Sequence, residues 1–354
     1  MEKIFIDPGN VNHSLVEKAA EILRQGKLVA FPTETVYGIG CRVDRKDAVK
    51  KLYAIKKRPI DKPFAIALHG IDGPIDNYFI TLPSFGYRLI ERFWPGPLTI
   101  VYYSQDDKKI GIRVPSHIIA REILKELVLA VYLPSANISG EKESASAAEV
   151  EAALGSSLDL IVDGGLCAYP QASTVIDLTY SPFKILREGA VGEREIISTF
   201  VKKRIMFVCA GNSCRSPMAQ FLLEKYLSQE RDDFEHRYEI ISRGIYAFEG
   251  AKASEPVIDI LKEKEELDLS LFNAKALDKY AVLSSDLIFT MEDAQSEYIL
   301  KLVPTAEGRV FTLKKFLTPE LEQNIPDPIG KEPAFYEKVY SLIKEAILEL
   351  RDWV

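Results

Sequence analysis

Cysteine and histidine are scarce in this chain. Only four of its 354 residues are cysteine and four are histidine. So few cysteines in so long a chain do not form a disulfide framework. No spacing among the cysteines and histidines resembles a zinc site. The sequence therefore argues against a small disulfide-rich fold or a zinc-ribbon fold, and its cysteines are better examined for reactivity.

Long apolar runs are also lacking. No apolar stretch is long enough to span a bilayer, and the opening residues, MEKIFIDPGN, contain no apolar segment typical of a signal peptide. We therefore expect a cytoplasmic protein with no membrane partner. The formal net charge of −7 argues against a generally basic nucleic-acid-binding protein. One local basic patch remains, in residues 50–63 (KKLYAIKKRPIDKP).

Two common nucleotide-binding motifs are missing. The chain has no G-x-x-x-x-G-K-[ST] loop, and no G-x-G-x-x-G loop follows a strand-like run. Any nucleotide site must therefore be built from other residues. The composition, 47% hydrophobic and 27% charged, is otherwise that of an ordinary folded protein.

The arrangement of apolar runs indicates an α/β fold. Runs typical of strands, such as residues 27–33 and 64–70, alternate with helix-like segments such as residues 48–58. The pattern starts again with an apolar strand at residues 205–208. Strand–helix alternation predicts a parallel sheet in each half.

The length favours two domains. We expect one domain over residues 1–200 and a second over residues 201–354. The junction, residues 193–204 (EREIISTFVKKR), has the pattern of a short helix without a flexible spacer.

A cysteine loop, VCAGNSCRSPMAQ, contains the predicted strand's last residue. Cys209 is followed by five residues and then by Arg215. Backbone N–H groups in a loop of this size can form an anion nest, and a helix starting near Pro217 points its positive dipole end at the same place. Arg215 adds a planar fork that suits phosphate. We expect this field to favour the thiolate, which would make Cys209 a nucleophile for phosphoryl transfer.

Other residues support the same chemistry. Gly211 and Asn212 are expected to supply unusual backbone angles, and Ser216 to hydrogen-bond the thiolate. The leaving group needs a carboxylic acid, for which Asp327, between two prolines in NIPDPIGKEP, is the candidate. A core cysteine and a turn aspartate are the alternative interpretation. The coincidence of strand, Gly-Asn loop, helix start and Asp-Pro favours the catalytic one.

From Arg204 onward the chain resembles the low-molecular-weight protein tyrosine phosphatases, through VCAGNSCRSPMAQ, SRGIYA, SDLIFTM, VFTLKKF and DPIG. The resemblance implies a doubly wound parallel-sheet domain in which Cys209 is the nucleophile, Arg215 binds phosphate and Asp327 is the general acid. Residues supporting the phosphate loop would be Gly211, Asn212, Ser213, Cys214 and Ser216. Cys214 stands at the position of a second cysteine that can bond to Cys209 under oxidant and shield it. No metal or cofactor is implied for this half.

The phosphatase substrate stays open at this level. Members that act on phosphotyrosine usually place aromatic residues after the Asp-Pro, whereas Ile329 and Gly330 follow here. Ser213 stands where many tyrosine phosphatases have a bulky aliphatic residue and the bacterial protein-arginine phosphatases have threonine. Tyr246 and Phe248 are candidates for the pocket wall. The resemblance implies a phosphorylated protein substrate that carries phosphotyrosine or phosphoarginine.

Three polar motifs occupy the first half. FPTETVYG ends a strand in hydroxyl groups that suit a small polar ligand. KKRPIDKP places Lys56, Arg58 and Lys62 on one bend, which suits a polyphosphate. PSANISG is a small-residue loop whose Ser135 and Asn137 are placed to approach a nucleotide. Taken singly, each motif also has a purely structural interpretation, as a self-bonded turn, a solvated basic face and an ordinary turn.

Taken together, FPTETVYG, YAIKKRPIDKP, WPGPLT, IGIRVP, PSANISG, STVIDL and LREG resemble, in this order, the YrdC-like threonylcarbamoyl-AMP synthases over about residues 10–195. The resemblance implies a twisted α/β sheet domain that combines L-threonine, bicarbonate and ATP into threonylcarbamoyl-AMP and pyrophosphate. Mg²⁺ would accompany ATP. The activated group would pass to adenosine in certain tRNAs, so the implied partners are other tRNA-threonylcarbamoylation proteins and tRNA itself.

The resemblance also implies ligand roles. Threonine or its carboxylate would be held by Thr35, Arg113 and Ser173. ATP would be held by Lys56, Arg58, Lys62, Ser135, Asn137 and Arg187. We expect catalysis by positioning and charge stabilisation, because these motifs contain no obvious general base.

Two positions depart from the family pattern. A histidine often found on the strand after the basic turn is replaced near Ala67, with His69 two residues further on. A threonine often found before the arginine of IGIRVP is replaced near Lys109. Both departures bear on the amino-acid substrate.

The sequence therefore predicts a bifunctional enzyme, a synthase fused to a cysteine phosphatase. The alternative is a first domain that binds nucleotide or RNA and targets an active phosphatase without synthesising anything. Pyrophosphate release that depends on threonine distinguishes the two.

Overall fold

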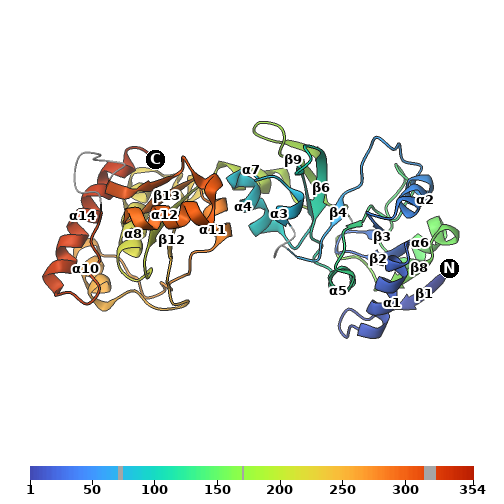
Figure 1. The fold of residues 1–354 in the computed structure, drawn as a ribbon, viewed down its shortest axis with the longest axis horizontal. Helices are drawn as coiled ribbons and strands as arrows, with labels where there is room; N and C mark the ends of the chain where they lie inside the picture. Colours follow the sequence, from blue (N-terminus) through green and yellow to red (C-terminus); the bar gives the residue numbers. More distant parts are fainter. Residues whose placement is uncertain (71–74, 170, 315–323) are drawn as a thin grey trace. The chain divides into compact units, whose positions relative to one another are not determined.

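The computed structural model describes residues 1–70, 75–169, 171–314 and 324–354. The chain divides into two compact units (Figure 1), the first made of Met1–Leu82 and Arg88–Ile197, and the second of Pro83–Tyr87 and Ser198–Val354. The last two residues of the VFTLKKF motif lie outside the described residues. None of the described helices is both long and apolar enough to cross a membrane.

The first unit contains a ten-stranded sheet with the strand order β1-β8-β2-β3-β7-β4-β6-β5-β9-β10. Its strands are β1 (Glu2–Phe5), β2 (Val29–Pro32), β3 (Tyr37–Arg42), β4 (Ile66–Ala67), β5 (Leu98–Tyr103), β6 (Lys109–Arg113), β7 (Val131–Tyr132), β8 (Leu160–Asp163), β9 (Thr174–Asp177) and β10 (Lys184–Arg187). The helices described up to residue 201 are α1 (His13–Arg24), α2 (Lys46–Lys56), α3 (Ile75–Tyr78), α4 (Ser84–Phe93), α5 (Ile118–Leu127), α6 (Ala147–Leu154) and α7 (Glu193–Val201). The short helix predicted at the junction is present as α7.

This sheet is mixed, so the parallel sheet predicted for the first half is wrong. The antiparallel pairs are β2–β3, β3–β7, β4–β7, β5–β6 and β9–β10. Only residues 33–36 separate β2 from β3, whereas parallel neighbours need a crossover of a dozen or more residues. The sequence pattern predicted neither β1 nor β3. Because β3 pairs with β2 after a short turn, the chain forms a hairpin where a crossover was expected.

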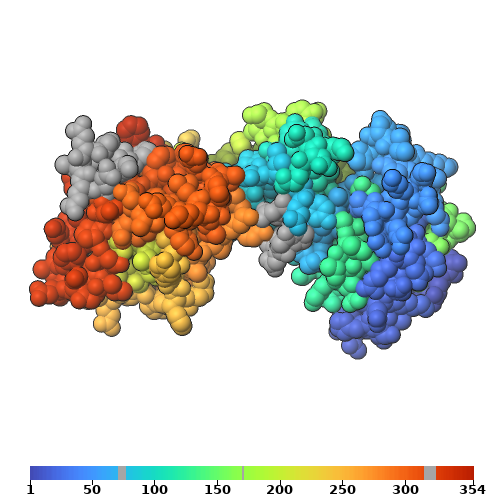
Figure 2. Space-filling model, viewed as in Figure 1, coloured from blue at the N-terminus to red at the C-terminus, as the bar shows by residue number. Residues whose placement is uncertain are grey.

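Helix α1 shows how local sequence sets this unit. The Asn12 side chain caps it by accepting from the Ser14 N–H, and Val16, Ala19, Ala20 and Leu23 form its buried face. That face joins a core cluster with residues of α5, β2 and β8. Strand β1 pairs in parallel with β8, so the blue N-terminal segment and the light-green β8 region lie side by side in Figures 1 and 2.

The second unit has the parallel sheet that the sequence predicts. Its strand order is β12-β11-β13-β14, and every described pair is parallel. The strands are β11 (Lys203–Cys209), β12 (Tyr238–Gly244), β13 (Leu287–Thr290) and β14 (Val310–Thr312). The described helices are α8 (Arg215–Glu230), α9 (Phe234–Arg237), α10 (Glu255–Glu265), α11 (Lys279–Ser284), α12 (Asp293–Leu302) and α14 (Pro333–Arg351).

Strand β11 is the centre of this unit. Ile205, Met206, Phe207 and Val208 are fully buried, as expected for a strand covered on both faces. The chain places β12 on one side of β11 and β13 on the other. Ligand sites of open parallel sheets lie at such a reversal of strand order, beyond the carboxyl ends of the strands. Cys209 is the last residue of β11.

A buried carboxylate joins three helices of the second unit. Glu265, at the end of α10, accepts hydrogen bonds from Lys225 and Tyr226 of α8 and from Lys344 and Tyr340 of α14. Burial alone would raise the pKa of Glu265, but these four bonds outweigh it and lower the pKa to about 2. The folded state therefore gains stability from the ionised Glu265, fully above its ordinary pKa of 4.5. This stability is lost as the pH falls through about 2.

We expect Glu265→Gln to destabilise the second unit by about 3 kcal/mol at neutral pH, since the pKa displacement corresponds to an energy of that order. The most protected amides of α8, α10 and α14 should then exchange roughly 100-fold faster, measured by hydrogen–deuterium exchange at pH 7. Amides of α1 and α5 in the first unit are the internal reference and should keep their rates. Unchanged protection in α10 would show that the Glu265 bonds contribute little.

Candidate functional site

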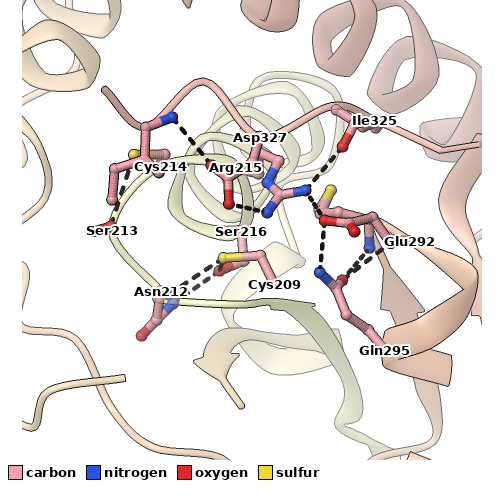
Figure 3. Close-up of polar contacts among 12 residues, drawn as sticks. Cys209, Asn212, Ser213, Cys214, Arg215, Ser216, Glu292, Gln295, Ile325 and Asp327 are labelled. Carbon is pink, nitrogen blue, oxygen red and sulfur yellow. Dashed lines mark hydrogen bonds and ion pairs between the residues drawn. The ribbon is translucent and has the colours of Figure 1, made fainter. Parts of the chain in front are cut away.

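The second unit has a small cavity at the end of β11. Its volume is about 180 Å³, and it is lined by Cys209, Ala210, Gly211, Ser213, Cys214, Arg215, Tyr246, Asp327 and Ile329. The loop from Ala210 to Cys214 leads directly into α8, which begins at Arg215. The structure thus brings Cys209, Arg215 and Asp327 together in one cavity, as Figure 3 shows.

Cys209 is held by donors on two sides. The Asn212 N–H donates to its sulfur at 3.2 Å, and the Ser216 hydroxyl lies 3.0 Å from it. Asn212 has a left-handed backbone with φ 51°, a conformation that asparagine tolerates better than most residues. Gly211 has no such angle, so the unusual backbone predicted for both residues is present at Asn212 alone. Ser216 lies where the sequence places a donor to the sulfur.

Arg215 is almost completely buried, and carboxylates partner it. One terminal nitrogen donates to Glu292 and, at 2.9 Å, to the Ile325 carbonyl, while the other donates to Asp327. Figure 3 shows the guanidinium among these three partners. Its Nε has no acceptor within the described part of the chain. The terminal nitrogens of the guanidinium are therefore fixed in place by protein acceptors.

Glu292 is a site residue that the sequence analysis missed. It lies two residues beyond β13, at the same sheet edge as Cys209. A carboxylate just after a strand that neighbours the cysteine strand was the available signal. The Gln295 side chain donates to Glu292 at 3.1 Å and so holds it toward Arg215.

The cavity rim is partly apolar. Tyr246 and Ile329 line it, and Tyr246 packs edge-to-face with Tyr298 at 6.4 Å between ring centroids. Phe248 is exposed and does not line the cavity. The Cys214 sulfur lies 3.2 Å from the Ser254 hydroxyl, and burial raises the pKa of this thiol despite the hydroxyls of Ser254 and Ser213. Cys209 and Cys214 are both free cysteines in this structure.

The first unit has a much larger cavity, of about 530 Å³. Seven of the nine predicted ligands line it: Lys56, Arg58, Lys62, Arg113, Ser135, Ser173 and Arg187. The other two, Thr35 and Asn137, are buried behind its wall and act on lining residues. Thr33 lines the cavity in place of Thr35.

Lys56, the last residue of α2, is buried at the edge of this cavity. Its ammonium donates to the Ser135 carbonyl at 2.6 Å and to the Asn137 side chain at 3.0 Å. Burial is the main cause that lowers the pKa of Lys56 to about 8, and the nearby cations Arg58 and Arg187 lower it further. The ammonium thus joins α2 to the loop that carries Ser135.

The other cations are held at the cavity by backbone or hydroxyl groups. Arg58 donates to the carbonyls of Lys62 and Pro63 at 2.8 and 3.1 Å, which fixes the basic bend. Arg187 donates to the Ser173 carbonyl and hydroxyl, each at 3.0 Å. Burial lowers the pKa of Arg187, and the Glu143 carboxylate, 3.7 Å away, opposes this shift. The cations therefore converge on one cavity from α2, the bend after it and β10.

Arg113 is held differently, by a buried carboxylate. It donates to the Thr35 hydroxyl at 2.9 Å and to the Gly96 carbonyl at 3.2 Å. Glu34 forms an ion pair with it at 2.8 Å. Glu34 was not predicted as a site residue although it lies inside the FPTETVYG motif. Thr35 thus contacts Arg113 instead of the cavity.

Three further features concern the predicted departures and missed residues. Ala67 lines the cavity, whereas His69 does not. Lys109 pairs with Asp177 at 3.2 Å, outside the lining. Asp61 and Glu143 contribute lining carboxylates that the sequence analysis did not name. Within the described ranges, no group of three or more His, Cys, Asp or Glu side chains is placed to hold a metal ion.

Two family models match the chain. The Sua5/YciO/YrdC model, described as telomere recombination, matches residues 21–189, and the low molecular weight phosphotyrosine protein phosphatase model matches residues 204–353. A threonylcarbamoyl-AMP synthase of Pyrococcus abyssi is 36% identical over 204 residues, which are 55% of this chain and 60% of that protein. The chain therefore spans less than two thirds of this relative's length.

Shorter relatives are covered almost completely. A putative threonylcarbamoyl-AMP synthase of Mycobacterium leprae is 33% identical over 51% of this chain and 86% of its own length. The crystal structure of Escherichia coli YciO matches with a TM-score of 0.50 and 27% identity, over 54% of this chain and 98% of that one. The Sua5/YciO/YrdC model falls on the half of the chain that contains the larger cavity.

The pKa of Lys56 predicts a pH dependence for anion binding in the larger cavity. A polyphosphate needs the ammonium form, so affinity should fall as the pH rises through about 8, by up to about tenfold per pH unit above it. The measurement is the dissociation constant of ATP by calorimetry from pH 7 to 9.5. Lys56→Met should bind weakly and lack this slope.

Lys62 provides the matched control, because its side chain is exposed on the same basic bend. Lys62→Ala should weaken ATP binding by a similar factor at every pH and keep the slope. A wild-type dissociation constant that is flat from pH 7 to 9.5 would contradict the role given to Lys56.

Proposed function

Residues 21–189 of this chain belong to the Sua5/YciO/YrdC family and residues 204–353 to the low-molecular-weight phosphotyrosine protein phosphatase family, and from this we propose a bifunctional enzyme. The first domain, residues 1–200, would make threonylcarbamoyl-AMP from L-threonine, bicarbonate and ATP. The second, residues 201–354, would hydrolyse phosphate from a protein side chain. We place both activities in the cytoplasm, where ATP and tRNA are available.

The convergence of cations on one 530 Å³ cavity is the observation that supports the synthase. Lys56, Arg58 and Lys62 would face the phosphates of ATP, with Ser135 beside them. Arg113 and Ser173 would bind threonine, and the ion pair with Glu34 fixes the direction of the Arg113 fork. Asn137 and Thr35 would act through Lys56 and Arg113, whose side chains they hold.

The products define what these residues must do. The threonine nitrogen attacks the carbon of bicarbonate and water leaves, and an oxygen of the resulting carbamate then displaces pyrophosphate from the α-phosphate of ATP. Bound Mg²⁺ would neutralise part of the phosphate charge, and the lining carboxylates Asp61 and Glu143 suit it, because Mg²⁺ usually takes one or two carboxylates together with substrate phosphates. The fixed cations would hold the phosphates and stabilise the leaving pyrophosphate. Transfer to tRNA would require other proteins of the threonylcarbamoylation pathway.

The arrangement of Cys209, Arg215 and Asp327 in one cavity supports the phosphatase. The Cys209 sulfur would attack phosphorus, and the bond from phosphorus to the leaving oxygen or nitrogen would break as Asp327 donates a proton to it. Water would then attack the phosphocysteine, with Asp327 accepting its proton, and release orthophosphate. Arg215 would hold the phosphoryl oxygens. This cleavage applies to phosphotyrosine and phosphoarginine alike, and both remain candidate substrates.

The synthase predicts pyrophosphate release that requires threonine. We expect Cys209→Ser protein, in which the phosphatase cannot act, to release pyrophosphate from ATP only when L-threonine and bicarbonate are both present. Arg113→Lys keeps the charge but loses the fork, so the KM for threonine should rise about tenfold to hundredfold while ATP affinity is unchanged. ATP binding without threonine-dependent release would favour the alternative, a nucleotide-binding module that targets the phosphatase.

The phosphatase predicts two distinct losses. Cys209→Ser should abolish phosphate release and leave pyrophosphate formation unchanged. Asp327→Asn should slow cleavage of a phosphotyrosine or phosphoarginine peptide by about 100-fold or more, and cleavage of p-nitrophenyl phosphate less, because nitrophenolate leaves without a proton. Phosphate release from the two peptides would be measured side by side, which also identifies the preferred substrate. Equal losses on all three substrates would remove Asp327 as the general acid.

A further inference from the structure

A chain of hydrogen bonds runs from the Cys209 loop to the outer part of α8. The side-chain amide nitrogen of Asn212 donates to the hydroxyls of Ser216 and Ser242, both at 2.9 Å. The Ser242 hydroxyl donates to the Gln220 side-chain oxygen at 2.7 Å. The Gln220 amide nitrogen donates to a carboxylate oxygen of Glu224 at 3.0 Å. Five side chains from the loop, α8 and β12 thus form one connected series.

Backbone partners of Gln220 and Asn212 show which amide atom of each side chain faces the serines. The Gln220 amide nitrogen also donates to the Ile240 carbonyl at 3.2 Å, so its oxygen must face Ser242. The Asn212 side-chain oxygen accepts from the Lys275 N–H at 2.8 Å, so its nitrogen must face the two serines. Ser216 therefore accepts from Asn212, and its own proton can point at the Cys209 sulfur at 3.0 Å or at the Arg243 carbonyl at 3.4 Å.

Of the five side chains in this series, Glu224 is the one that can ionise. It lies one helical turn beyond Gln220 on α8, half-buried. Burial raises the pKa of Glu224 to about 7, while the bond from Gln220 opposes this shift. Its charge therefore changes around neutral pH. Above pH 7 the Glu224 carboxylate accepts a charge-assisted hydrogen bond from Gln220. Below pH 7 the protonated Glu224 accepts only an ordinary hydrogen bond.

The charged groups that pack around α8 from other elements pair elsewhere. From α10, Glu265 binds Lys225. From α14, Lys344 binds Glu265 and Arg351 binds Glu230. From β12, Glu239 pairs with Arg204, and Arg243 donates to the Ser242 carbonyl. From α9, Arg237 pairs with Asp233. Within the described part of the chain, the hydrogen bond to the Glu224 carboxyl group comes from Gln220.

We propose that Glu224 is a positioning residue of the phosphatase site, acting through Gln220, Ser242 and Asn212 to direct the Ser216 proton at the Cys209 sulfur. The carboxylate holds the Gln220 amide, the amide oxygen sets the Ser242 proton, and Ser242 in turn holds Asn212. The proposal rests on the proposed phosphatase function for its catalytic readout. The reactivity of the Cys209 sulfur tests it without that function.

The first test compares wild type with Glu224→Gln, which keeps the acceptor oxygen and removes only the charge. With p-nitrophenyl phosphate as substrate, kcat of the variant should be lower by about threefold to tenfold at pH 8, the difference between a charged and a neutral acceptor. The two proteins should converge as the pH falls through 7 to 5.5, where wild-type Glu224 is protonated. Inhibition by orthophosphate should stay within about twofold, because Arg215 is untouched.

Controls separate this role from loss of structure. Glu230→Gln removes another α8 carboxylate, one that pairs with Arg351, and should leave the pH profile unchanged. In a Gln220→Met background, Glu224→Gln should cause no further loss, because the connection is already broken. A wild-type to Glu224→Gln ratio that is constant from pH 5.5 to 8.5, or that is near one at pH 8, would overturn the proposal. Additive losses in the double variant would do the same.

The second test measures alkylation of Cys209 by iodoacetamide, followed by peptide mass spectrometry. At pH 7.5 to 8, Glu224→Gln should slow this alkylation by about threefold to tenfold, with convergence at lower pH. Alkylation of Cys167 in the other unit is the internal reference. If wild type cleaves no phosphomonoester, the proposed phosphatase function fails, while the alkylation rates still decide the role of Glu224. Equal alkylation rates in both proteins would overturn it.

Discussion

A cation buried beside a cavity must be given hydrogen-bond acceptors by the protein before any anionic ligand arrives, and this constraint organises both units. An unpaired buried charge is too costly to keep, so each such cation gathers partners from distant segments. Arg215 draws Glu292 from the end of β13 and Asp327 from the loop before α14 into one place. Lys56 draws the loop of Ser135 and Asn137 onto the end of α2. The shape of each cavity follows from these bonds.

The chemistry of the sites was predictable where the residues are close in sequence. Cys209, Arg215 and Ser216 lie in one loop and helix start, so their spacing alone places a sulfur beside a guanidinium. The partners of these groups were not predictable in the same way. Glu292 is 77 residues from Arg215 and Glu143 is 44 residues from Arg187 in number, so only the fold brings them together. The sequence marks which group is charged but not what neutralises it.

The fold was predictable to a similar extent. The parallel sheet of the second unit follows from long crossovers between its strands, and the structure has it. The first unit is mixed because β3 returns after only a short turn, and no apolar alternation marked β3 as a strand. Thr35 and Asn137 lie in the expected motifs but behind the cavity wall, since burial of a side chain depends on the strand pairing around it. The division at residue 200 and the ligand roles stay predictions.

The two carboxylates on Arg215 also bear on what happens after a reaction. A departing product anion leaves behind a guanidinium that Asp327 and Glu292 can occupy again at once, so the protein contains its own competitor for the product. This internal competition by the two carboxylates weakens the binding of any small anion. Ligands that make further contacts, for example with Tyr246 and Ile329 on the rim, can still bind tightly. The site would then discriminate between a free anion and the same anion attached to a larger molecule by how readily each leaves the cavity as well as by how each binds there.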